Sequence, residues 1–306
     1  MSIHYIGELS LNKPNLFLVG AMKSGTSTLH ELLASHPQIT MSEPKEPCYF
    51  VEPEMLKTYW PEMWRMGIWK SEEAYLALFP KKSGAKYFGE SSTDYSKAPK
   101  LAGVVGKLAA YSPDARILYV MRDPVERTLS HYWHMAEHRG EVRGPVEAFT
   151  QDTHYTEVSH YAFQLLPYIK HFGRERVYSL TFEALKNHPL ETVQALYAWM
   201  GVDSNFEPTD LRGARNATPE AVRQKRPGRS MLDRFRYSVL WNKVGGYCPS
   251  TVRKLGVALI EKPVQPKSVD MSEAKAYLRT LQRPQTEELA RLLGRDFPEW
   301  KTLYGE

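Results

Sequence analysis

The chain has 306 residues, of which 42% are hydrophobic, 25% charged and 12% aromatic. A chain of this length can bury a core without disulfides or a structural metal, and its composition excludes collagen, a coiled coil and wholesale disorder. No apolar run reaches the roughly 20 residues of a membrane-spanning helix, and we expect neither an integral membrane segment nor a signal peptide. Two cysteines in so long a chain favour a reducing compartment, so we expect a cytoplasmic protein.

The formal net charge is +5, and its distribution is uneven. Between Arg212 and Arg236, eight cationic residues face two acidic ones, which leaves the rest of the chain nearly neutral. A concentrated basic segment suggests a flap for an anionic ligand, although a solvated loop explains it equally well. A nucleic-acid binder more often spreads its charge over one face and carries a reading motif, so we expect no nucleic-acid partner.

Short apolar runs alternate with amphipathic stretches along the chain. In chain order the pattern predicts a strand at 16–20, a helix at 27–35, a strand at 86–89, a helix at 97–110, a strand at 116–121, a helix from Pro124 to about His138 capped by Asp123, a strand at 176–180, a helix at 189–200 and a helical region at 271–300. Such alternation predicts an α/β fold with a P-loop-like parallel sheet flanked by helices on both faces. Residues 203–270 are basic and show no regular pattern, and we expect residues 1–306 to form one domain.

A glycine-containing loop follows the first predicted strand. Gly20 and Gly25 have the spacing of the nucleotide-triphosphatase loop, but Thr26 stands where that loop has its lysine, and the lysine is at position 23. Small residues before a helix N-terminus allow backbone amides to bind an oxyanion. Lys23 inside the loop suits stabilisation of a leaving phosphate oxygen without a metal ion, which disfavours a magnesium-dependent phosphotransferase. A plain glycine turn with a solvated lysine is the alternative.

Arg122 follows the 116–121 strand, whose carboxyl end should lie beside this loop in a doubly wound sheet. A guanidinium at that place can bind a phosphate through two hydrogen bonds, and two adjacent anion sites imply a ligand with two separated anionic groups. The alternative is a simple ion pair between Arg122 and Asp123.

Four motifs in order resemble the sulfotransferases that use 3′-phosphoadenosine-5′-phosphosulfate (PAPS), especially the heparan sulfate and Golgi-type branch and its bacterial relatives. They are GAMKSGTST at 20–28, KEPCYF at 45–50, GESSTDY at 89–95, and RDPVER at 122–127 with Ser130. Segments at 161–201 and 292–300 are also similar. The chain departs from the heparan enzymes at Ser91, where they often have lysine, and at Thr93, where proline is usual.

The resemblance implies PAPS as co-substrate and no metal. It places the 5′-phosphosulfate on Lys23, Ser24, Gly25, Thr26, Ser27 and Thr28, and the 3′-phosphate on Arg122 and Ser130. The basic run that includes Arg229 suggests in addition that Arg229 closes over the 3′-phosphate. For Ser130 alone, an ordinary helix-surface serine is an equal alternative.

The resemblance also assigns the catalytic base to Glu46, with Lys23 stabilising the departing phosphate. An ion pair of Glu46 with Lys45 is the simpler interpretation of the same residue. Glu90 is expected to orient the base or a substrate group. His30 and His131 are reserve candidates for the base, because lone histidines on helices are more often structural.

The acceptor is expected to be a hydroxyl or amine of a carbohydrate or small molecule. Trp64, with Trp60 and Trp69, follows the expected base and can wall an acceptor pocket, although a spacing of four residues is more typical of core-facing helix positions. Two other functions stay open at this stage: an ATP-dependent phosphotransferase, and a module that binds the nucleotide without catalysis.

Overall fold

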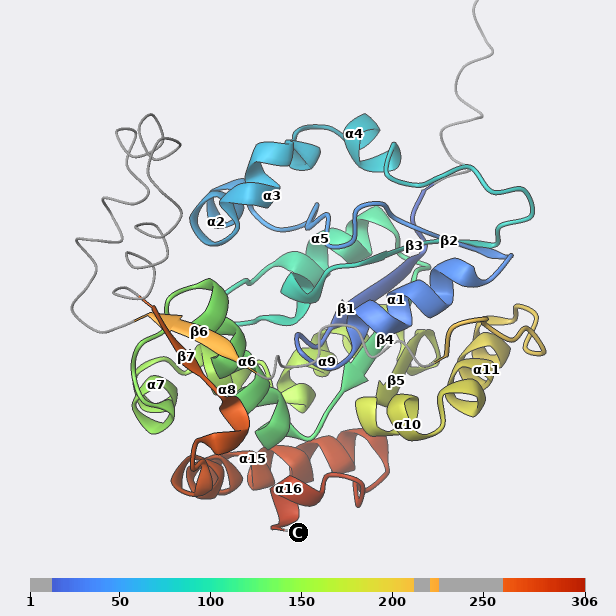
Figure 1. Ribbon diagram of the computed structural model, residues 1–306. Helices are drawn as coiled ribbons and strands as arrows, with labels where there is room; N and C mark the ends of the chain where they lie inside the picture. Colours follow the sequence, from blue (N-terminus) through green and yellow to red (C-terminus); the bar gives the residue numbers. More distant parts are fainter. Residues whose placement is uncertain (1–12, 212–220, 226–260, 306) are drawn as a thin grey trace, which may run out of the picture.

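Five parallel strands form the central sheet of the computed structural model, which describes residues 13–211, 221–225 and 261–305 (Figure 1). The strand order is β2-β3-β1-β4-β5, and every neighbouring pair is parallel. The strands are β1 (Leu16–Gly20), β2 (Ile39–Met41), β3 (Tyr87–Ser91), β4 (Arg116–Met121) and β5 (Val177–Thr181). Because a parallel sheet is covered on both faces, its strands are rich in apolar residues throughout.

Alternate residues of each strand contact opposite layers, as the period of two requires. In β1, Phe17 and Val19 belong to one apolar cluster, while Leu16 and Leu18 belong to the other. The Leu16 side of the sheet is covered by α1 (Thr26–Ser35), α10 (Phe182–Asn187) and α11 (Pro189–Met200). The Phe17 side is covered by α5 (Val104–Tyr111), α6 (Pro124–His138), α9 (Tyr161–Phe172) and α15 (Ser272–Leu293). The predicted α/β architecture with helices on both faces is therefore confirmed.

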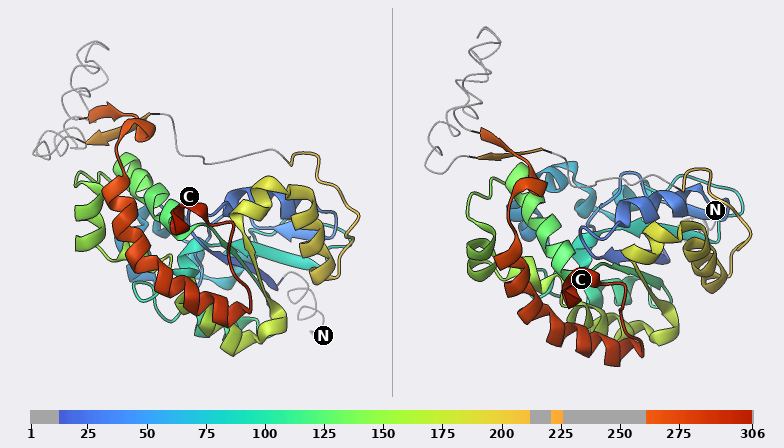
Figure 2. Two further views of the ribbon diagram at one scale, coloured as in Figure 1. Left: turned by 90° about the horizontal axis from the view of Figure 1, so that it is seen from below. Right: turned by 60° about the horizontal axis from the view of Figure 1, so that its bottom comes forward.

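The remaining helices extend the Phe17 side. Figure 1 shows α2 (Pro53–Tyr59), α3 (Pro61–Met66) and α4 (Glu72–Leu76) as a separate layer along the top of the view. Leu56 and Tyr75 anchor this layer in the larger apolar cluster. The short helices α7 (Pro145–Gln151) and α8 (His154–Glu157) follow α6, and Figure 2 shows α15 beside α6 with α16 (Lys301–Tyr304) close by.

The predicted start of α6 is confirmed in detail. Asp123 caps the helix by accepting hydrogen bonds from the amides of Val125 (3.0 Å) and Glu126 (3.2 Å), and Pro124 occupies the first helical position. The second carboxylate oxygen of Asp123 accepts from the amide of Leu303 at 3.0 Å. Asp123 is thereby fully used as a structural group, which argues against the simple pair with Arg122.

Several predicted boundaries are wrong for identifiable reasons. The expected helix at 97–110 begins only at Val104, because Pro99 disfavours helical geometry at Ala98 and Gly103 adopts a left-handed φ of 81°. The expected helical region at 271–300 is shorter than predicted, since α15 ends at Leu293, before Gly294, whose φ is 67°. β5, the last strand of the central sheet, runs from Val177 to Thr181, one residue later than expected. β3 ends two residues later than expected.

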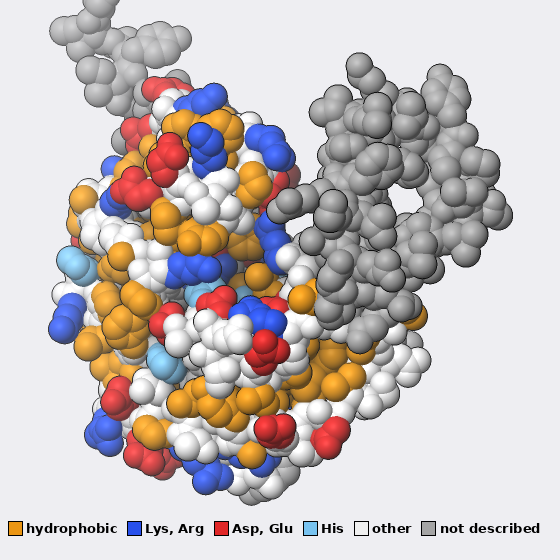
Figure 3. Space-filling model, turned by 90° about the vertical axis from the view of Figure 1, so that its left-hand side faces the viewer, with side chains coloured by type: hydrophobic (Ala, Val, Ile, Leu, Met, Phe, Trp, Pro, Cys, Tyr) orange, Lys and Arg blue, Asp and Glu red, His pale blue; other side chains and the backbone are white. Residues whose placement is uncertain are grey.

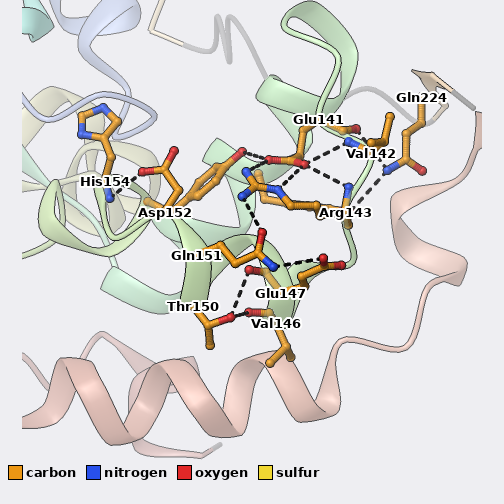
Figure 4. Close-up of polar contacts among 12 residues, drawn as sticks. Glu141, Val142, Arg143, Val146, Glu147, Thr150, Gln151, Asp152, His154 and Gln224 are labelled. Atoms are coloured by element: carbon orange, nitrogen blue, oxygen red, sulfur yellow. Dashed lines mark hydrogen bonds and ion pairs between the residues drawn. The ribbon is translucent and has the colours of Figure 1, made fainter. Parts of the chain in front are cut away.

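The basic segment at 203–270 contains regular structure that its sequence did not indicate. β6 (Val222–Lys225) pairs antiparallel with β7 (Glu261–Val264). Gln224 of β6 is buried and donates to the hydroxyl of Tyr132 and to the carbonyl of Glu141, both at 3.4 Å. The Glu141 carboxylate in turn accepts from Arg143, as Figure 4 shows, and from the hydroxyl of Tyr155. This network fixes the strand pair to the end of α6.

Candidate functional site

The loop between β1 and α1 has the geometry of an anion-binding loop. Gly25 has a φ of 88°, and a Cβ there would lie 2.7 Å from the ring of Phe182, so both conformation and space require glycine. No side chain caps α1. Ser24 is fully buried, and no group in the described ranges hydrogen-bonds its hydroxyl. A buried hydroxyl without a partner at a helix N-terminus fits an anionic ligand.

Arg122 lies beside this loop, as its place after β4 predicts. The amide of Ala21 donates to the carbonyl of Val120 at 2.7 Å, which joins the ends of the two strands. The Arg122 guanidinium donates to the carbonyl of Lys23 at 3.3 Å and lies 3.6 Å from the Glu126 carboxylate. Burial, and secondarily the charge of Arg122, lower the pKa of Lys23 from its ordinary value of 10.5. Two cations thus share the space at the carboxyl ends of β1 and β4.

A cavity of about 360 Å³ opens next to the loop. Its lining includes Ser27 from the first turn of α1, Glu46 from the loop after β2, and Asp94 from the segment after β3. The other described residues that line it are Lys45, Cys48, Trp60, Glu62 and Met63. Figure 3 shows this side of the molecule, where acidic, basic and histidine side chains gather around a depression near the middle of the face.

Glu46 is a partly exposed carboxylate at this cavity. It accepts from the Lys45 ammonium at 2.5 Å and from the Thr93 hydroxyl at 3.3 Å, and both bonds are made to Oε1. Burial acts to raise the pKa of Glu46, but the nearby ammonium groups of Lys45 and Lys97 and the two hydrogen bonds outweigh it and lower the pKa below 4.5. Glu46 is therefore ionised at neutral pH, and the ion pair with Lys45 is present as well.

Glu90 does not line the cavity but lies in a layer beneath it. Its carboxyl is fully buried and accepts from Tyr75 (2.6 Å), Tyr95 (2.9 Å) and Ser92 (2.6 Å). Ser92 also accepts from the amide of Cys48 at 3.1 Å, so this network supports the loop that carries Glu46. Glu90 is placed to position the loop rather than to touch an acceptor.

Burial raises the pKa of Glu90 to about 7, from an ordinary value of 4.5. The folded state therefore binds a proton more tightly than the unfolded state, and the resulting stability, complete below pH 4.5, is lost as the pH rises toward 7. We expect the free energy of unfolding of the wild type to fall by about 3 kcal/mol over this interval relative to Glu90→Gln. Denaturant unfolding of both proteins at several pH values measures this; parallel curves would contradict the assignment.

The two reserve histidines are both structural in their surroundings. Nδ1 of His30 lies 2.8 Å from the hydroxyl of Ser91, and burial lowers the pKa of His30 to about 4. His131 is fully enclosed, packs against Tyr155 with ring centres 4.8 Å apart, and has its pKa lowered well below the usual range, first by burial and then by Arg127. Neither is among the described residues that line the cavity.

The tryptophans differ from their predicted arrangement on one helix. Pro61 starts α3, so Trp60 lies at the junction of α2 and α3 instead of within a helix. Trp60 lines the cavity, whereas Trp64, the expected acceptor contact, stacks on Trp69 with ring centres 6.0 Å apart. Both Trp60 and Trp64 are partly buried against the larger apolar cluster. Trp60, not Trp64, thus holds the position expected of a pocket wall.

The remaining expected residues fall into three groups. Thr26, Ser27 and Thr28 form the first turn of α1, as the loop motif predicts. Ser130 is buried on α6, two turns beyond Arg122. Arg229 lies outside the described residues.

Sequence reasoning did not single out Glu62, Met63 or Asp94, which line the cavity, or Lys97, which pairs with Asp94. Asp94 lies within the third motif, and its position there was the available signal. Glu62 and Met63 follow Trp60-Pro61 in a stretch with no motif, so only the fold brings them to the site.

Two features are absent from the described ranges. No three His, Cys, Asp or Glu side chains there are grouped so that they could hold a metal ion. No helix there is both long and apolar enough to cross a membrane.

Comparisons with known proteins agree on the family. Among curated relatives, the membrane-associated sulfotransferase kil1 of Dictyostelium discoideum is 35% identical over 122 residues, which is 39% of this chain and 22% of the relative. The bifunctional heparan sulfate N-deacetylase/N-sulfotransferase 1 of Caenorhabditis elegans is 24% identical over 201 residues, 61% of this chain and again 22% of the relative. The matches thus span about a fifth of each curated relative.

A solved structure matches a larger share of this chain than these curated relatives do. The crystal structure of a sulfotransferase from Alicyclobacillus acidocaldarius matches with a TM-score of 0.69 and 25% identity, over 94% of this chain and 98% of that one. The model of the sulfotransferase family matches residues 14–208, which include the loop, Glu46, Glu90 and Arg122. This chain belongs to the sulfotransferase family.

Proposed function

We propose that this transferase moves a sulfuryl group from PAPS to a hydroxyl or amine of a carbohydrate or small-molecule acceptor. One observation carries the proposal: a single cavity is lined both by Ser27, from the anion-binding loop, and by Glu46, an ionised carboxylate. A donor held on the loop and an acceptor held beside Glu46 would therefore meet in one space.

The residues present fit the two charged ends of PAPS. The unpaired hydroxyl of Ser24, the amides of Gly25, Thr26 and Ser27, and the ammonium of Lys23 would hold the 5′-phosphosulfate. Arg122 and the buried Ser130 would hold the 3′-phosphate on the neighbouring side of the loop. Phe182 contacts both phosphate sites, because its ring packs against Gly25 of the loop and its ring centre lies 5.1 Å from the Arg122 guanidinium.

In the proposed reaction a bond forms from the acceptor oxygen or nitrogen to sulfur, and the bond from sulfur to the phosphate oxygen breaks. Glu46 takes the acceptor proton, and Lys23 stabilises the negative charge that develops on the phosphate. Both described partners of the Glu46 carboxylate bind Oε1, so we assign the proton to Oε2. The products are the sulfated acceptor and 3′-phosphoadenosine-5′-phosphate (PAP).

Two further assignments belong to this proposal. We take residues 1–306 as one sulfotransferase domain. We also propose a cytoplasmic location, which the buried thiol of Cys48 suits because thiols stay reduced there.

A comparison of nucleotides by thermal unfolding tests the donor. We expect PAP to raise the melting temperature more than AMP, because only PAP carries the 3′-phosphate, and more than ATP with magnesium. An equal or larger shift with magnesium ATP would favour a phosphotransferase instead. Stabilisation by PAP without any conversion of PAPS to PAP would favour a module that binds the nucleotide without catalysis.

Arg122→Ala should weaken PAP binding by about 10- to 100-fold, which is the loss expected when a charged hydrogen bond to phosphate is removed. AMP affinity should change much less, because AMP does not reach this residue. Arg176→Ala is the control, since Arg176 is partly exposed and pairs with exposed Asp114 at 3.2 Å near the opposite end of the sheet. Calorimetric titration of the three proteins decides; unchanged PAP affinity in Arg122→Ala would show that the 3′-phosphate lies elsewhere.

A further inference from the structure

We infer that the acceptor is a small molecule without negative charge, and that the Glu62–Arg139 pair at the cavity contributes to this selectivity. The inference rests on the proposed function and narrows its acceptor class. It starts from the charges around the cavity, which three acidic side chains line: Glu46, Glu62 and Asp94.

Each of these carboxylates already holds a cation of its own. Glu46 pairs with Lys45 at 2.5 Å, and Glu62 pairs with Arg139 at 2.8 Å. Asp94 forms a buried pair with Lys97, whose side chain is only 4% exposed. Among the described residues that line the cavity or pair with its lining, the charges therefore balance, and every cation there is held by a carboxylate.

The aromatic ring of Trp60 covers two of these cations. The Lys97 ammonium lies 5.0 Å from the ring centre, and the Arg139 guanidinium lies 4.4 Å from it. An acceptor carboxylate or sulfate would have to displace a carboxylate from one of these cations to gain an ion pair. Leaving a partly buried charge unpaired is costly, and bringing two anions together adds repulsion.

The size of the cavity also favours a small acceptor. Its volume of about 360 Å³ is at the lower end of small-molecule sites, which suits one ring system better than a polymer segment. Trp60, Glu62 and Met63 cover it from the junction of α2 and α3. Arg139, which follows α6, holds this cover by contacting both Trp60 and Glu62, so the cover is attached across the site.

The test uses acceptors in matched pairs that differ by one carboxylate. The probes are phenol with 4-hydroxybenzoate, 2-naphthol with 6-hydroxy-2-naphthoate, methyl glucoside with methyl glucuronide, and N-desulfated heparin as a polyanion. With radiolabelled PAPS we expect kcat/KM of the wild type to favour the neutral member of each accepted pair by about tenfold or more. Preference for the charged members, or for heparin, would overturn the inference.

Glu62→Gln removes the negative charge that holds Arg139. We expect the preference for neutral acceptors to shrink by about three- to tenfold in this variant, because the guanidinium becomes available to an acceptor anion. Glu54→Gln is the matched control, since Glu54 is exposed on α2 and does not line the cavity. An equal neutral-to-charged ratio in the wild type, Glu62→Gln and Glu54→Gln would overturn the role of the pair.

Failure of the proposed function gives a different result from failure of this inference. If PAP does not bind, the donor assignment is wrong, whatever the acceptor panel shows. If PAP binds and N-desulfated heparin is sulfated while none of the small acceptors is, the sulfuryl transfer is upheld and the small-acceptor inference is wrong.

Discussion

Glu46→Gln is expected to lower kcat by about 10²- to 10⁴-fold, the range for loss of a general base. Glutamine keeps the size of the side chain and can hold the same backbone conformation, whose φ of 62° is left-handed. It cannot take a proton from the acceptor. PAP affinity should stay within about twofold, because the loop and Arg122, not Glu46, are assigned to the nucleotide.

Glu43→Gln provides the control for this variant. Glu43 is exposed in the same loop after β2 and is not among the described residues that line the cavity. Its kcat should match that of the wild type. A Glu46→Gln enzyme with normal kcat would remove Glu46 from the chemistry, and normal PAP binding with lost turnover would separate catalysis from nucleotide binding.

The second large effect is expected for Lys23→Met, with kcat lowered by about 10²- to 10³-fold, as for loss of one group that stabilises a developing anion. PAP affinity should fall much less, because the loop amides and Arg122 still hold both phosphates. Lys23 is half-buried, and burial and Arg122 lower its pKa, so an anion in the loop would stabilise its charged form. If kcat falls by a larger factor than PAP affinity, Lys23 stabilises the transition state more than it stabilises bound PAP.

Lys186→Met is the control for the loss of a lysine. Lys186 is exposed on α10, close in sequence to Phe182, which contacts the loop. Steady-state kinetics and PAP titration of the three proteins give the comparison. If kcat and PAP affinity of Lys23→Met fall by the same factor, Lys23 binds the nucleotide uniformly and has no special part in the transfer.

The elements nearest the nucleotide were predictable from sequence because local rules determine them. β1, β4, α6 and α11 have their predicted bounds, since continuous apolar runs define the two strands and a capping Asp123 with Pro124 defines the start of α6. The anion loop and Arg122 follow from these elements, because parallel strands end at one edge of the sheet.

The acceptor side was not predictable in the same way. Its cover comes from short helices that begin at Pro53 and Pro61, and no regular period identifies them. The contacts that shape it, Arg139 with Glu62 and Lys97 with Asp94, depend on the tertiary fold, and for Arg139 and Glu62 the partners are 77 residues apart. Trp64 was expected at the acceptor because it follows Glu46 in an aromatic stretch, but a break at Pro61 directs Trp60 to the cavity instead.

A crystal structure of the complex with PAP tests the central claim most directly. The 5′-phosphate should lie on the amides of Gly25, Thr26 and Ser27 with Lys23 in contact, and the 3′-phosphate should contact Arg122 and Ser130. The cavity beside Glu46 should stay open to an acceptor. Nucleotide bound at another place, or Lys23 directed away from the 5′-phosphate, would contradict the assignment of this site to sulfuryl transfer.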